Sequence, residues 1–126
     1  MDRWEAQYHF WSSFGIPAYP EEAVPDRKNI TFPYITYQPL SGGFEAVLTQ
    51  SASIWTRSTS WEEADKKADE IERYIRSMGC PKIDGGRYRV FIPDSVFAQS
   101  MGDPNDDQIK RKLLSVQIEF MTEEGV

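Results

Sequence analysis

One stretch decides the fold: SWEEADKKADEIERYIRSMG, residues 60–79. Ser60 can accept hydrogen bonds from the first free backbone N–H groups of a helix while Glu63 reaches back to Ser60, which is the capping-box arrangement. Gly79 can adopt the left-handed conformation that closes a helix. Between these ends, apolar residues recur at steps of three and four: Trp61, Ala64, Ala68, Ile71, Ile75 and Met78. The stretch therefore predicts one helix whose apolar stripe covers one face of a sheet.

Length and composition narrow what the chain can be. With 126 residues, we expect one domain over residues 1–126 with a sizeable core. A net charge of −6 argues against sequence-independent binding of nucleic acid, because that activity needs a basic face. The single cysteine, Cys80, excludes an internal disulfide, no apolar run approaches the roughly 20 residues that span a bilayer, and the N-terminus shows no export signal. We expect a soluble intracellular protein with no membrane partner.

The N-terminal part of the chain is unusually aromatic. Helical spacing over residues 3–14 predicts a short first helix with Asp2 as its N-cap. Its aromatic residues are Trp4, Tyr8, Phe10, Trp11 and Phe14. They exceed what one face of a small sheet usually absorbs, so some are candidates for contact with another subunit, and ordinary core packing is the alternative. Three prolines in residues 16–31 predict an extended connector after this helix.

Four segments have the composition of β-strands: 32–39, 44–57, 87–92 and 109–122. Prolines at both ends of the first predict an edge strand, and a Gly-Gly turn before the second predicts a hairpin. The polar cluster Thr49-Gln50-Ser51 suggests a bulge within the second strand.

The remaining segments complete the predicted order. We expect a polar loop over residues 93–107 and a frayed tail over residues 123–126. The order α-β-β-α-β-β then predicts an α+β fold, in which the central helix and the short N-terminal helix pack on a four-stranded, mostly antiparallel sheet.

No catalytic, cofactor or metal motif accompanies this fold. Cys80 follows a predicted helix C-terminus, where the dipole disfavours a thiolate, and the glycine pairs lack the residues of a phosphate-binding loop. The acidic loop around Asp103 lacks the ligand spacing of an EF-hand. We therefore expect no enzyme activity and no cofactor. The alternative is a small ligand-binding domain or enzyme with an unrecognised acidic site, which predicts a deep polar pocket on a stable monomer.

Several segments together resemble a known family. The aromatic first helix leads into Phe14-Gly15-Ile16-Pro17-Ala18-Tyr19, and later segments are Pro33-Tyr34-Ile35-Thr36-Tyr37, Ser53-Ile54-Trp55-Thr56-Arg57-Ser58 running into the Trp61 helix, and Ile109-Lys110-Arg111-Lys112. In order and character, over most of the chain, they resemble the tail terminator or tail-completion proteins of long-tailed bacteriophages, also called head-tail joining or minor capsid proteins. The resemblance implies a small subunit without catalytic residues. Such subunits form a ring, expected to be hexameric, that caps the tail tube and stops its polymerisation.

The resemblance also implies partners and a location. The partners are further copies of the chain, the major tail-tube protein and the head-tail connector protein, while DNA passes through without specific binding. The location is the host cytoplasm during assembly and then the head-proximal end of the virion tail. A head-side connector or minor capsid subunit is the alternative within the same class.

Exposed aromatic and loop residues are the candidates for the contacts of such a ring. On this argument the protein-interface candidates are Trp4 and Trp11 in the first helix, Trp55 and Arg57 on the sheet face away from the central helix, and Phe97, Met101, Asp103 and Asp106 in the polar loop.

Overall fold

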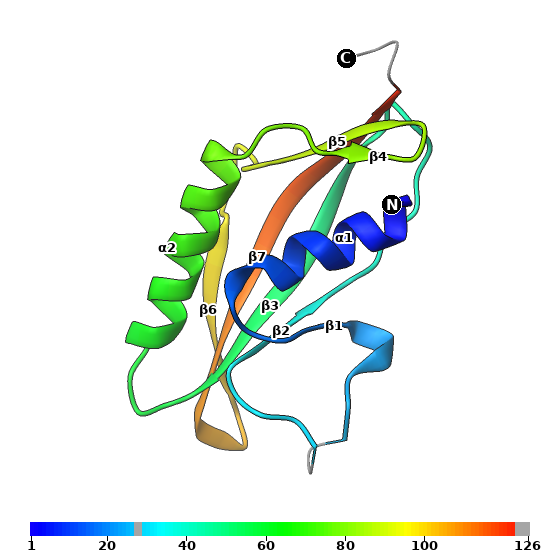
Figure 1. Ribbon diagram of the computed structural model, residues 1–126. Coiled ribbons are helices and arrows are strands. Elements are labelled where there is room, and N and C mark those ends of the chain that lie inside the picture. The colour runs from blue at the N-terminus through cyan, green and yellow to red at the C-terminus, as the bar shows by residue number, and fades with distance from the viewer. Residues whose placement is uncertain (27–28, 123–126) are drawn as a thin grey trace.

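The helix predicted over residues 60–79 is present as α2, Glu62–Ser77, and it packs across a large sheet (Figure 1). The computed structural model describes residues 1–26 and 29–122. None of the helices in these ranges is long and apolar enough to cross a membrane. The other elements, in chain order, are α1 Arg3–Trp11, η1 Ser12–Phe14, β1 Ala18–Pro20, η2 Glu21–Ala23, β2 Tyr34–Tyr37, β3 Val47–Arg57, β4 Lys82–Ile83, β5 Gly86–Phe91, β6 Ala98–Asp103 and β7 Asp106–Thr122.

The sheet is built around β7, a strand of 17 residues. One edge of β7 pairs antiparallel with the whole of β3, and its other edge pairs with β6 in the first half and with β5 in the second. The strand order is β1-β2-β3-β7-β5-β4, with β6 beside β7. The α+β class and the four predicted strands are confirmed as β2, β3, β5 and β7. The four-stranded description is wrong, because β1, β4 and β6 bring the sheet to seven strands.

Two of the added strands lie in segments predicted as irregular. Within residues 16–31, β1 pairs parallel with β2, so β1 and not β2 is the edge strand. An edge position tolerates Pro20, because a proline there costs the sheet no ladder hydrogen bond. Within residues 93–107, β6 pairs with β7 from Ala98 opposite Leu114 to Gly102 opposite Lys110. Its small and polar residues form a strand because β7 offers a long unpaired edge.

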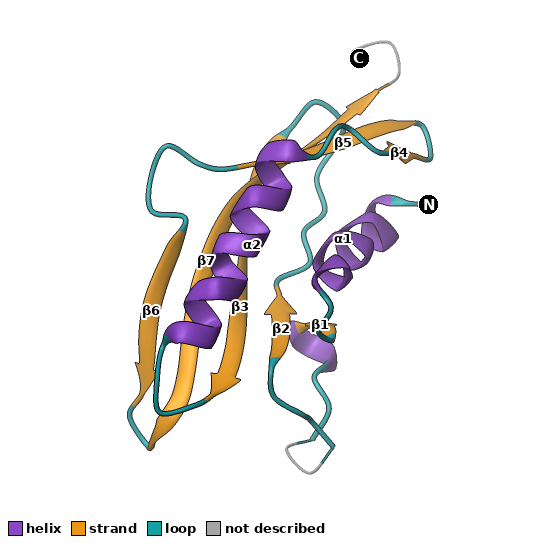
Figure 2. Cartoon of the chain, turned by 60° about the vertical axis from the view of Figure 1, so that its left-hand side comes forward, coloured by secondary structure: helices purple, strands orange, loops and turns teal. Residues whose placement is uncertain are grey.

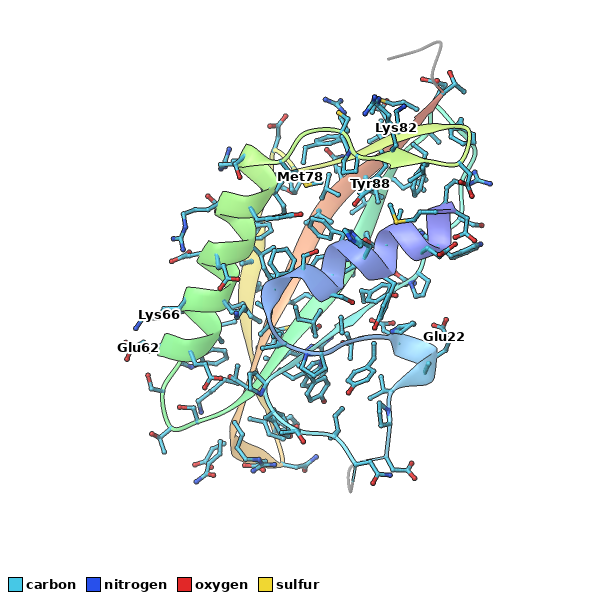
Figure 3. All side chains as sticks on the ribbon, in the orientation of Figure 1. Glu22, Glu62, Lys66, Met78, Lys82 and Tyr88 are labelled. Carbon is cyan, nitrogen blue, oxygen red and sulfur yellow. The ribbon has the colours of Figure 1, made fainter. Side chains whose placement is uncertain are left out.

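The apolar stripe of α2 is confirmed. Ala64, Ala68, Ile71 and Ile75 are buried against the sheet, while the Glu62–Lys66 ion pair, 2.7 Å long, points away from it (Figure 3). The predicted ends of the helix need correction.

At the N-terminus of α2, the Ser60 hydroxyl accepts from the backbone N–H of Glu62 at 3.0 Å, but the Ser60 N–H donates to Ser58 and not to Glu63. At the C-terminus, the backbone turns extended at Met78, and Gly79 is not left-handed. The helix therefore lacks both the complete capping box and the glycine closure.

Helix α1 lies on the same sheet face as α2 (Figure 2). Asp2 is its N-cap, as predicted, and the cap is a capping box with Glu5. The helix turns Phe10 and Trp11 into the core, whereas Trp4 and Tyr8 stay half-exposed.

A buried polar network joins α1 to the sheet. The Trp11 indole N–H donates to the Gln50 side-chain oxygen, and the Gln50 amide donates to the Gln7 side-chain oxygen, both at 2.9 Å. Gln7 in turn bonds both backbone groups of Leu40. The register of β3 against β7 runs without interruption past residues 49–51, so the predicted bulge is wrong. The polar character of that cluster reflects the buried amide of Gln50, which this network satisfies.

Candidate functional site

The face of the sheet opposite the helices carries a continuous set of side chains that we call the outer face. Residues of β3 alternate between the two faces, so Ser53, Trp55 and Arg57 point away from the helices. Antiparallel partners share a face, which adds residues from three neighbouring strands. The outer face is thus formed by Tyr34, Thr36, Ser53, Trp55, Arg57, Met101, Arg111 and Leu113.

A stack of two aromatic rings and one guanidinium group occupies the centre of the outer face. The Tyr34 and Trp55 rings are nearly parallel, at 12°, with centroids 6.1 Å apart. The Arg111 guanidinium carbon lies 4.8 Å from the Trp55 ring centroid. The Trp55 indole N–H donates to the Thr36 hydroxyl at 2.9 Å, and Arg111 Nε donates to the Ser53 hydroxyl at 3.0 Å. These contacts hold large side chains in fixed positions before any partner binds.

The arginines of this side of the sheet differ in their charge partners. Arg57 pairs with Asp106 at 2.9 Å, and Arg89 of β5 pairs with Glu119 at 2.8 Å. Among the residues that the structure describes, no carboxylate forms an ion pair with Arg111. Its charge is available to a carboxylate brought by another molecule.

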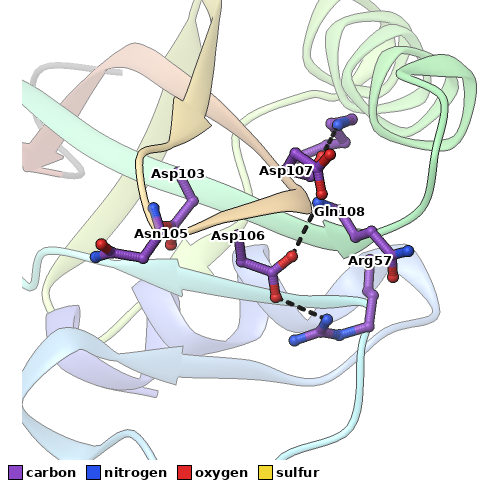
Figure 4. A network of polar contacts seen from close by, with 7 residues as sticks. Arg57, Asp103, Asn105, Asp106, Asp107 and Gln108 are labelled. Atoms are coloured by element: carbon purple, nitrogen blue, oxygen red, sulfur yellow. Dashed lines mark hydrogen bonds and ion pairs between the residues drawn. The ribbon is translucent and has the colours of Figure 1, made fainter.

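The Arg57–Asp106 pair ties β3 to the turn between β6 and β7 (Figure 4). The Asp106 carboxylate accepts from the backbone N–H of Gln108 at 2.9 Å, and Asp103 accepts from the backbone N–H of Asn105 at 2.8 Å. The hydrogen bond from the Gln108 backbone lowers the pKa of Asp106 below its ordinary value, and the bond from Arg57 is the second cause of this shift. Both aspartates therefore shape the turn.

We expect Asp106→Asn to reduce the loss of stability on acidification. A carboxyl whose pKa is lowered by folding stabilises the fold above the unfolded pKa near 3.8, and this stabilisation is lost as the pH falls through the lower folded value. Melting temperatures at pH 7 and pH 3 should differ less in Asp106→Asn than in the wild type. Asp107→Asn is the matched control, because within the described residues no hydrogen bond or ion pair involves the Asp107 carboxylate, whereas its backbone carbonyl accepts from Lys110. Equal pH dependence in all three proteins would contradict this role of Asp106.

The predicted interface residues divide into several groups. Trp55, Arg57 and Met101 lie on the outer face, with Met101 opposite Arg111 and 36% exposed. Trp4 is exposed on α1, on the helix side of the sheet, and Phe97 is half-buried against the core. Trp11 is 0% exposed, so its prediction as an interface residue is corrected: its indole packs in the core and bonds Gln50.

Sequence reasoning missed Tyr34 and Arg111. The sequence pattern places Tyr34 in a strand without indicating its face, and it places Arg111 in a strand without a role. The alternation of β3 could have identified both, had the pairing partners of Trp55 been known.

An acidic hollow of about 430 Å³ lies between α2 and β6. Its charged lining comprises Asp65, Asp69 and Glu72 from the helix and Lys112 from β7, and Lys112 pairs with Asp65 at 2.6 Å. Within the described part of the chain, no group of three or more His, Cys, Asp or Glu side chains is placed to hold a metal ion.

Comparison with known proteins finds a similar fold but no similar sequence. No protein-family model matches this chain, and no curated protein is significantly similar to it in sequence. Among solved structures, a small α+β protein of a virus shares the fold. It is the bacteriophage SPP1 gp17 protein, which matches with a TM-score of 0.56 over 94% of this chain and 88% of its own, at 14% sequence identity. At this identity the likeness shows a shared fold.

Proposed function

We propose that the chain is a structural subunit of a bacteriophage virion, which forms a ring on the head-proximal end of the tail tube, ends tube polymerisation and joins tail to head. The observation that carries the proposal is the fold shared with a bacteriophage protein over 94% of the chain. The match covers 94% of this chain and 88% of the bacteriophage protein, so the shared fold extends over nearly the whole domain. The order and character of the sequence segments, which resemble those of tail-completion proteins, support the same role.

The outer face supplies the ring contact in this proposal. A ring closes through heterologous contacts, in which one surface of each subunit meets a different surface of the next. Trp, Tyr and Arg are the residues that most often dominate binding energy at interfaces, and Trp55, Tyr34 and Arg111 form one stack here. Because hydrogen bonds already fix Trp55 and Arg111, little conformational entropy is lost when the neighbour docks.

The net negative charge of the chain is consistent with contact between subunits and with passage of DNA through the ring. A subunit with a net charge of −6 can offer carboxylates to Arg111 of its neighbour. A lumen without a basic lining would let DNA slide, since phosphates are held mainly by lysine and arginine. The proposed partners are further copies of the chain, the tail-tube protein and the head-tail connector protein, in the host cytoplasm and then in the virion tail.

A growth assay tests the capping role. Tail-tube protein of the same phage is polymerised with and without the purified chain, and tube lengths are measured on electron micrographs. We expect substoichiometric amounts of the chain to shorten the tubes, because one ring per end suffices. Unchanged lengths, with binding to connector protein instead, would favour a head-side connector and contradict the terminator role.

A further inference from the structure

A second surface lies on the helix side of the sheet, between α1 and the segment that follows β1. It is a groove of about 380 Å³, which we call the aromatic groove. Trp4 and Tyr8 form one wall, since residues four apart stand on the same side of a helix. Each of the two side chains is 53% exposed. Large aromatic surface that the fold leaves uncovered is typical of an interaction site.

Buried contacts make the aromatic groove rigid. Tyr37 at the end of β2 also lines it, and the Tyr37 ring stacks on Trp11 with centroids 6.4 Å apart at 17°. Trp11 is itself fixed by its bond to Gln50. Burial raises the pKa of Tyr37 to about 12, and the neighbouring Tyr8 and Glu22 add smaller effects in the same direction. The phenol is therefore neutral at physiological pH. Tyr37 is therefore a fixed and uncharged part of the groove lining.

The polar side chains that line the groove are acidic. Glu5 of α1 and Glu22 of η2 are exposed carboxylates at the groove, and none of the residues that line it is basic. Aromatic rings beside carboxylates attract a guanidinium or ammonium group, through the ring face and through the opposite charge. This combination selects a cation with an apolar stem.

The apolar lining indicates the shape of the segment that would carry this cation. Pro20 and Pro39 complete the groove beside the three aromatic rings. Grooves lined by aromatic rings bind extended proline-rich segments, because such segments are already ordered and lose little entropy on binding.

We infer that the aromatic groove binds an extended, proline-containing segment of a partner protein, with an arginine or lysine of that segment held between the Trp4 and Tyr8 rings and the carboxylates of Glu5 and Glu22. The groove and the outer face lie on opposite sides of the sheet. Binding here is therefore independent of the proposed ring contact.

Titration calorimetry on the full chain tests the inference. The probe is a synthetic peptide of four Pro-Pro-Arg repeats, with Pro-Pro-Glu and Gly-Ser-Arg repeats as comparison peptides. We expect the first peptide to bind with a Kd below 1 mM, and the other two to bind at least tenfold more weakly. Trp4→Ala, Tyr8→Ala and Glu22→Lys should each weaken binding at least tenfold, whereas Val96→Ala, at an apolar side chain that is 64% exposed in another part of the surface, should leave it unchanged.

Several outcomes would overturn the inference. The Pro-Pro-Arg peptide could fail to bind, or it could bind all variants equally. It could also bind no better than the Gly-Ser-Arg peptide, which would show that charge alone causes the binding. Self-association of the wild type that Trp4→Ala abolishes would show that a second copy of the chain occupies the groove. Circular dichroism of each variant confirms that it is folded, which these exposed positions allow.

Discussion

Replacing Trp11 with alanine is expected to lower the free energy of unfolding by about 4 kcal/mol, in the range for large-to-small changes in a core. Trp11 is fully buried, and its ring contacts those of Phe10, Phe14 and Tyr37. The substitution leaves a cavity between α1 and the sheet. It also removes the donor that Gln50 accepts from, and an unsatisfied buried acceptor costs roughly 1–3 kcal/mol.

Trp4→Ala is the matched control, because it removes the same side chain from the same helix. With 53% of Trp4 exposed, we expect a loss of no more than about 1 kcal/mol. Urea unfolding followed by circular dichroism measures both values. If Trp11→Ala proves too unstable to measure, Trp11→Phe keeps an aromatic ring at this position and loses the five-membered ring with its N–H. Equal costs for Trp4→Ala and Trp11→Ala would contradict the assignment of Trp11 to the core.

The second large effect concerns assembly. Arg111→Glu is expected to abolish ring formation while the subunit stays folded, because it reverses a charge that has no carboxylate partner among the described residues and sits at the centre of the outer face. Loss of one such contact costs about 2 kcal/mol, roughly 30-fold in affinity, and it recurs at every interface of a closed ring. Trp55→Ala should also weaken assembly, because Trp55 belongs to the same stack on the outer face.

Arg73→Glu is the control for this charge reversal. Arg73 is exposed on α2, on the opposite side of the sheet from Arg111. Light scattering at high protein concentration, with tail tubes added where the free chain is monomeric, reports the mass of the assembly. An Arg111→Glu protein that assembles as well as Arg73→Glu would exclude the outer face as the ring contact.

The parts of the fold that sequence could predict are those with strong local patterns. The stripe from Ala64 to Ile75 and the alternation from Leu114 to Phe120 each match one structural period over many residues. The Asp2 N-cap of α1 could also be predicted, because an N-cap depends only on residues at the start of its own helix.

Several features that the sequence did not predict depended on contacts distant in sequence. Nothing within residues 98–103 predicts a strand, and β6 forms because the first half of β7 needs a partner. Gln50 looked like a local irregularity, although its partners Gln7 and Trp11 lie about forty residues away. For the same reason helical spacing grouped Trp4 with Trp11, while the packing against Tyr37 separates them.

Only part of the candidate site could be predicted from the sequence. Alternation placed Trp55 and Arg57 on the face away from the helix, as the structure has them. The stack with Tyr34 and Arg111 needed the pairing of β2 and β7 with β3, which no local pattern contains.

The most direct test of the central claim is electron microscopy of tail tubes capped by the wild-type chain, averaged without imposed symmetry. We expect a ring of identical subunits at one end of each tube, with six-fold symmetry. The Tyr34–Trp55–Arg111 stack should be buried between neighbouring subunits of this ring. Single copies scattered along the tube, or a ring in which this stack faces solvent, would contradict it.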